Sequence, residues 1–131
     1  MAVSNLFLAA GAFTLGLSLA ISQTHAAEQR CGWLINPTPG NLFLIDKDAT
    51  WNITSQMEAN GPDAAGAENT PDFDPRQFVK TQAPEMDYGY GCACVRVETN
   101  ARQERVTRVL SGGTLPLARC KADKSLPSPT G

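Results

Sequence analysis

The four cysteines are the residues of this sequence best suited to chemistry, and they are Cys31, Cys92, Cys94 and Cys120. Four thiolates can bind zinc, but structural zinc sites usually pair cysteines with about two to four residues between them, whereas Cys92 and Cys94 have only one between them. A redox dithiol favours a C-x-x-C pair at a helix start, whereas the GCACV stretch is typical of a strand. In an exported domain, an even number of cysteines indicates two disulfides, with metal binding or thiol redox chemistry as the alternative.

Cys92 and Cys94 limit the ways in which two disulfides can form. In an extended strand their side chains lie on the same face about 7 Å apart, and a bridge between them would need a strained turn. The remaining pairings are Cys31–Cys92 with Cys94–Cys120, or Cys31–Cys94 with Cys92–Cys120, and the sequence does not choose between them. In either case one strand is linked to both the start and the end of the domain.

Carboxylates are the second group that could do chemistry. Asp72 and Asp74 in PDFDPR, or Asp46, could supply the acids of glycoside hydrolysis. The DKDAT stretch at residues 46–50 resembles the start of a calcium loop, but it lacks the Gly and the Glu that such a loop needs at its sixth and twelfth positions. We therefore expect an acidic turn here, and no catalytic residue, metal or cofactor in the chain.

The only histidine, His25, lies in a segment with the features of a signal peptide. Residues 6–21 carry no charged side chain, and Thr24 and Ala26 fit the small-residue positions before a secretory cleavage site. We predict a signal helix and signal peptide at residues 1–26, with an uncleaved membrane anchor as the alternative. Removal of this leader would leave no histidine, which excludes Ser–His and Cys–His nucleophiles and histidine-containing zinc sites.

The rest of the chain is typical of one small exported domain. Residues 27–123 suit a single disulfide-stabilised domain, and we expect a disordered tail at residues 124–131, which lack a helix or strand pattern. The net charge is only −2 and the basic residues are scattered, which argues against a nucleic acid partner. The leader predicts a periplasmic or secreted protein, without stable membrane insertion once the leader is removed.

A first hairpin is expected shortly after the turn cluster NPTPGN at residues 36–41. Apolar residues on both sides of the DKDA turn would place Ile45 opposite Trp51 and Phe43 opposite Ile53. These four side chains would then share one face of the hairpin.

A second hairpin is expected around a loop at residues 100–103. Its register would oppose Val97 to Val106 and Glu98 to Arg105, so that apolar meets apolar and acid meets base. The predicted fold is therefore mainly β with little helix: a small antiparallel sheet of two hairpins. Because the core of such a domain is thin, we expect disulfides to stabilise it.

Aromatic residues form a candidate binding surface, which consists of Trp33, Trp51, Tyr88 and Tyr90. In an extended strand the two tyrosines share a face with the C-x-C cysteines, while glycines on the other face let another backbone come close. A shallow aromatic platform for sugar or peptide is one interpretation. The other, which we favour, is that the tyrosines pack over the disulfides beside Trp33.

Three motifs together resemble a family of small exported bacterial four-cysteine proteins whose function is unknown. The motifs are CGWLINPTPGNLFLIDKDATWNI, YGYGCACV and LPLARCKAD, and they extend over residues 31–123. The resemblance implies the exported compartment and the cysteine framework, and it implies no activity. We expect the loop after Met57 to be longer than in the family pattern.

Small size, two expected disulfides and the lack of a complete catalytic set favour a non-catalytic binding or inhibitor module. Its expected partner is a periplasmic protein or another component of the cell envelope. A carboxylate-based hydrolase of cell-wall glycan is the second hypothesis, and a thiol-redox or metal-binding protein is the third.

Overall fold

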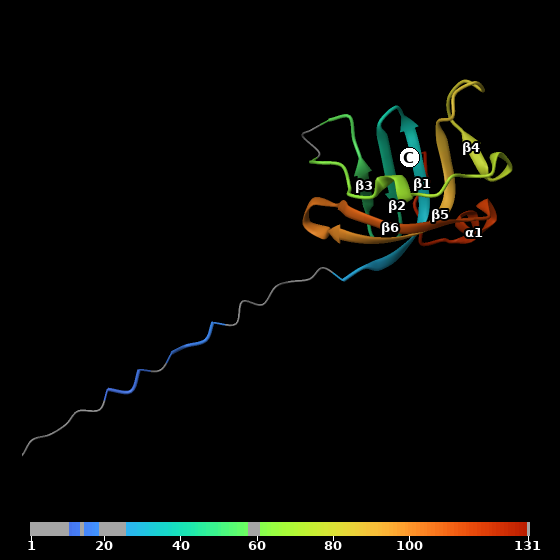
Figure 1. The fold of residues 1–131 in the computed structure, drawn as a ribbon. Coiled ribbons are helices and arrows are strands. Elements are labelled where there is room, and N and C mark those ends of the chain that lie inside the picture. Colours follow the sequence, from blue (N-terminus) through green and yellow to red (C-terminus); the bar gives the residue numbers. More distant parts are fainter. Residues whose placement is uncertain (1–10, 14, 19–25, 58–60, 131) are drawn as a thin grey trace, which may run out of the picture.

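The structure is a computed structural model that describes residues 11–13, 15–18, 26–57 and 61–130 (Figure 1). Most of the predicted signal helix and His25 lie outside the described residues, so the signal peptide stays a prediction. Within the described part of the chain, no helix is long and apolar enough to cross a membrane.

Strands dominate the described residues. They are β1 (Glu28–Thr38), β2 (Asn41–Ile45), β3 (Thr50–Thr54), β4 (Phe78–Lys80), β5 (Gly89–Asn100) and β6 (Arg105–Leu115). The helical segments are short: η2 (Ala67–Asn69), η3 (Pro75–Gln77), η4 (Ala101–Gln103) and α1 (Leu117–Ala122). The prediction of a mainly β chain with little helix is therefore confirmed.

The strands form one mixed sheet in the order β1-β2-β3-β6-β5-β4. Because β1 also pairs with β5, the strands β1-β2-β3-β6-β5 close into a ring, and β4 extends the sheet beyond it. The prediction of an antiparallel sheet of two hairpins is wrong at one place, since β3 and β6 run parallel where the ring closes. A five-stranded Greek-key ring of this kind resembles the OB fold, and a fold by itself assigns no ligand.

A short loop segment completes the closure between β3 and β6. The N–H of Asn52 donates to the carbonyl of Glu104 at 2.9 Å, and beyond this point the two strands diverge. Ala64 and Ala65 then lie between them, since Ala64 N–H donates to Ile53 and Ala65 N–H donates to Thr107. Backbone hydrogen bonds therefore close the ring, partly between the two strands and partly through this loop segment.

The predicted register of the first hairpin is wrong by one residue. Trp51 pairs with Leu44 rather than with Ile45. The cause is Asp46, whose carboxylate accepts the N–H groups of Asp48 and Ala49 and so shortens the turn. Leu44 and Trp51 consequently face the interior together, with exposures of 0% and 3%.

The predicted register of the second hairpin is also wrong, because β6 contains two bulges. Val97 pairs with Val109, and Glu98 pairs with Arg108, to which it also forms an ion pair at 3.5 Å. At the loop Glu104 adopts a left-handed conformation with φ of 50°. Val106 and Val109 are three residues apart, so in a regular strand they would lie on opposite faces of the sheet. The bulges let both of them face the interior together with Val95 and Val97 of β5.

Two hydrophobic clusters lie on opposite faces of β1 and β5. The cluster inside the ring consists of Leu34, Leu44, Trp51, Ile53, Ala64, Ala93, Val95, Val97, Val106 and Val109. The outer cluster consists of Trp33, Ile35, Cys92 and Cys120, and α1 and the tail cover it through Leu117 and Leu126. The segment predicted to be a disordered tail therefore contributes a side chain to the fold.

Candidate functional site

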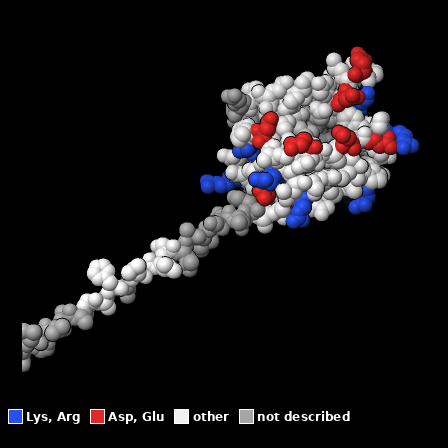
Figure 2. Space-filling model, viewed as in Figure 1, with Lys and Arg blue, Asp and Glu red and all other residues white. Residues whose placement is uncertain are grey.

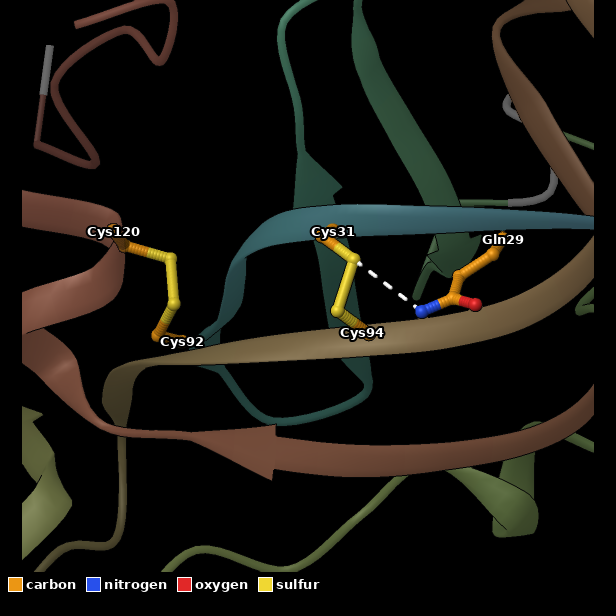
Figure 3. Close-up of a disulfide and its surroundings, with 5 residues drawn as sticks. All are labelled: Gln29, Cys31, Cys92, Cys94 and Cys120. Atoms are coloured by element: carbon orange, nitrogen blue, oxygen red, sulfur yellow. Dashed lines mark hydrogen bonds between the residues drawn. A yellow bond between two sulfur atoms is a disulfide. The ribbon is translucent and has the colours of Figure 1, made fainter. Parts of the chain in front are cut away.

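The two disulfides are Cys31–Cys94 and Cys92–Cys120 (Figure 3). This is the second of the two pairings that the sequence left open. Cys31–Cys94 joins directly opposite positions of β1 and β5, and its Cα atoms are 4.0 Å apart. Cys92–Cys120 attaches α1 to β5, with 5.7 Å between the Cα atoms. In this oxidised form no cysteine offers a thiolate to a metal ion.

The structure separates the four aromatic residues of the candidate binding surface. Trp33 and Tyr90 meet in the outer cluster with their ring centroids 5.2 Å apart, edge to face. Trp51 lies inside the ring, and Tyr88 is half-buried just before β5. Because both tryptophans are almost fully buried, at 4% and 3% exposure, these four residues do not form one exposed platform.

Asp46 is the one buried charged residue of the described chain, and its contacts are structural. Its carboxylate accepts the guanidinium of Arg30 at 2.7 Å and the indole N–H of Trp51 at 3.0 Å, while Arg30 also lies 3.9 Å over the Trp51 ring. Burial alone would raise the pKa of Asp46. The hydrogen bonds from Arg30, Trp51 and the backbone outweigh burial and hold that pKa below its usual value.

The other two predicted carboxylates lie in the segment before β4. Asp74 caps η3, where its side chain accepts the backbone N–H and the guanidinium of Arg76, and these hydrogen bonds lower the pKa of Asp74. Asp72 lies on the edge of a groove that neither Asp74 nor Asp46 lines. Of the three carboxylates, Asp46 and Asp74 are therefore engaged in structural hydrogen bonds, and only Asp72 lines the groove.

That groove is a concavity with a volume of about 580 Å³. It opens at one end of the ring between the β1–β2 turn, residues 70–75 and β4. Its apolar side includes Phe73 and Phe78, whose rings stack with centroids 5.6 Å apart. The sequence did not indicate either phenylalanine as a site residue, because the two rings come together only in the folded chain.

Two of the three sequence motifs build this groove. Asn36, Gly40 and Asn41 of NPTPGN line it directly, and Gly40 permits the turn with φ of 74°. Gly91 of YGYG lies under Phe73, since a Cβ at this glycine would be 2.3 Å from the phenylalanine ring. The motif residues are therefore explained by the shape of the groove as well as by the disulfides.

Hydrogen bonds hold the polar edge of the groove in place. The Asn36 amide donates to the carbonyl of Asp87 at 3.3 Å, and the Asn41 amide donates to the Thr38 hydroxyl at 2.6 Å. Lys80 forms an ion pair with Asp87 at 3.3 Å. Figure 2 views the face crossed by residues 61–75, and it shows acidic side chains spread across this face with basic ones toward its edges.

One comparison with known proteins found a match, and two found none. A family model described as "Protein of unknown function (DUF4087)" matches residues 25–127, which include all four cysteines and every residue of the groove. No curated protein and no solved structure matches the chain.

Proposed function

Because the chain belongs to the DUF4087 family, whose description states no function, we propose a function from the groove itself. The protein is a non-catalytic binding domain that works outside the cytoplasm and holds an extended segment of a partner protein in the groove. The observation that carries this proposal is one concave site that residues of the NPTPGN motif line directly and that Phe73, packed on Gly91 of the YGYG motif, lines from the other side.

The groove has the composition of a binding site. Stacked Phe73 and Phe78 offer an apolar surface, as does the partly buried side chain of Leu42. Asp72 and Asp87 supply two carboxylates at the edge against the single ammonium of Lys80. This balance favours a ligand that has both apolar and basic side chains.

An exposed strand edge favours a peptide as the ligand. Among the described strands, β4 pairs only with β5, so its other edge has no partner strand. Phe78 and Lys80 are alternate residues of β4 and both line the groove. An extended peptide could add to this edge through backbone hydrogen bonds while its alternate side chains enter the groove.

The compartment and the lack of catalysis rest on separate observations. Two disulfides are typical of proteins in an oxidising environment outside the cytoplasm. A glycoside hydrolase needs a carboxyl group whose pKa is raised, so that it is protonated when it donates a proton. The hydrogen bonds of Asp46 and Asp74 shift their pKa values in the opposite direction.

The test is an NMR titration of the oxidised protein, purified after export with its own leader. The probes are a short peptide of alternating valine and lysine, the same peptide with glutamate for lysine, and soluble peptidoglycan fragments. We expect saturable shifts at Asn36, Phe73 and Phe78 with the lysine peptide, and binding roughly tenfold weaker in Phe78→Ala. Leu110→Ala is the matched control, because Leu110 is an exposed apolar residue that does not line the groove.

Two results would contradict the proposal. One is a lack of saturable binding by the lysine peptide. The other is cleavage of the peptidoglycan fragments that is lost in Asp72→Asn, which would favour the hydrolase.

A further inference from the structure

The two disulfides differ sharply in their access to solvent. Cys92 and Cys120 are 1% and 4% exposed within the outer cluster. Cys31 is exposed and Cys94 is half-buried. Thiol–disulfide exchange begins when a thiolate approaches a sulfur atom in line with the S–S bond, so access decides which bond can react. Of the four cysteines, Cys31 is the most exposed residue, so the Cys31 side of Cys31–Cys94 is the most open to this approach from solvent.

The strands around Cys31–Cys94 would keep the two cysteines together after reduction. The pairing of β1 with β5 runs without interruption from Glu28 opposite Val97 to Asn36 opposite Gly89, and Cys31 opposite Cys94 lies within it. Backbone pairing before and after this point therefore keeps Cys31 and Cys94 opposite each other. The reduced pair would be ready to close again without a search of conformations.

Cys92–Cys120 has no such support. Its partner cysteine lies on α1, a helix of only six residues that contacts the sheet mainly at β5. Reduction would place two thiols in the apolar outer cluster and remove the covalent attachment of the helix. The two bonds are thus suited to different tasks.

A polar group is also placed beside the exposed sulfur. The side-chain amide of Gln29 donates to Sγ of Cys31 at 3.8 Å (Figure 3). Gln29 and Cys31 are alternate residues of β1 and lie on the same face of the strand. A hydrogen-bond donor at this position would stabilise negative charge on that sulfur.

We propose that Cys31–Cys94 is a site of thiol–disulfide exchange with an external dithiol, and that Cys92–Cys120 is the permanent structural link. The thiolate of the dithiol attacks Sγ of Cys31, the Cys31–Cys94 bond breaks, and Cys94 leaves as a thiolate that takes a proton from water. The second thiol, deprotonated by water, then attacks the sulfur of the dithiol that is bound to Cys31. Cys31 leaves as a thiolate beside the Gln29 amide and takes up, through water, the proton that the second thiol released. The protein thus gains two thiols and the dithiol is oxidised to its disulfide.

The test exposes the native oxidised protein to limiting dithiothreitol, alkylates free thiols with iodoacetamide at successive times, and locates the label by peptide mass spectrometry. We expect Cys31 and Cys94 to be labelled roughly tenfold faster than Cys92 and Cys120. The far-ultraviolet circular dichroism should not change in the fast phase. With glutathione in place of dithiothreitol, the trapped mixed disulfide should be on Cys31.

Two variants separate the site from general unfolding. In Gln29→Ala, release of the mixed disulfide from Cys31 should be slower while the unfolding midpoint is unchanged. In Cys31→Ser with Cys94→Ser, the fast phase should be absent. Labelling of all four cysteines at one rate, or loss of the folded signal in step with labelling of Cys31, would overturn the proposal on the wild-type protein alone.

Discussion

At the scale of single residues, Asp46 links the sequence to the register of the sheet. Its carboxylate sets the length of the β2–β3 turn, orients Trp51 and pairs with Arg30. Because Asp46 is 4% exposed, removal of its carboxylate leaves buried donors without an acceptor. The residue that the sequence presented as a candidate acid is therefore a structural centre.

We expect Asp46→Ala to lower the free energy of unfolding by about 3–5 kcal/mol, as is typical when one member of a buried ion pair is removed. Urea unfolding at neutral pH measures this loss. Asp48→Ala is the matched control, since Asp48 also contacts Arg30, at 3.1 Å, but its side chain is 54% exposed. Its cost should be below about 1 kcal/mol. Equal costs for the two variants would show that Asp46 has no special role.

The Asp46 carboxylate should also make the stability of the protein depend on pH in the acid range. The pKa of Asp46 is lowered in the folded protein, so its contribution is present above the unfolded pKa of about 3.9 and is lost as the pH falls through the folded pKa. The urea midpoint of the wild type should therefore fall below about pH 4, and it should fall less in Asp46→Asn. A steeper fall in that variant would contradict the assignment. The pKa of Asp74 is also lowered, but its ion pair with Arg76 lies at an exposed site, so Asp74→Asn should change the acid dependence less than Asp46→Asn does.

At the scale of elements, glycine at position 91 lets a loop pack on a strand. Phe73 occupies the space where a Cβ of residue 91 would lie, at 2.3 Å. We expect Gly91→Ala to displace Phe73, to lower the free energy of unfolding by about 1–3 kcal/mol and to weaken peptide binding in the groove. Gly113→Ala in β6 provides the comparison, because a Cβ there has no atom within 4 Å. Unfolding and the Phe73 ring signals in NMR measure both effects, and similar losses in the two variants would refute the explanation.

At the scale of the whole molecule, the two disulfides close loops of different length, with sequence separations of 63 and 28 residues. The chain-entropy model assigns each about 3.5–4.5 kcal/mol. Removal of each disulfide should nevertheless affect a different part of the fold, because only Cys92–Cys120 attaches α1 to the ring.

In Cys92→Ala with Cys120→Ala, we expect the amides of α1 to lose protection from hydrogen exchange while those of β1, β2 and β5 keep it. In Cys31→Ala with Cys94→Ala, α1 should keep its protection. Uniform loss across the chain in the first variant would show that the outer cluster and the ring unfold as one unit.

The sequence by itself determined the local features of this protein. Alternating apolar residues marked the strands, the NPTPGN cluster marked a turn, and the cysteine count indicated two disulfides, all of which the structure contains. These features depend on neighbours within a few residues, so pattern and turn chemistry suffice to recognise them.

The tertiary structure alone decided the disulfide pairing, both strand registers, the parallel closure of the ring and the groove. Two bulges in β6 and the hydrogen bonds that the Asp46 carboxylate accepts in its turn changed the strand registers. The alternation of apolar and polar residues does not predict such changes. Phe73 and Phe78 acquire their role only because β4 and Gly91 bring their rings together in the folded chain. Such features arise from contacts between distant parts of the chain, which become defined only when the ring is closed.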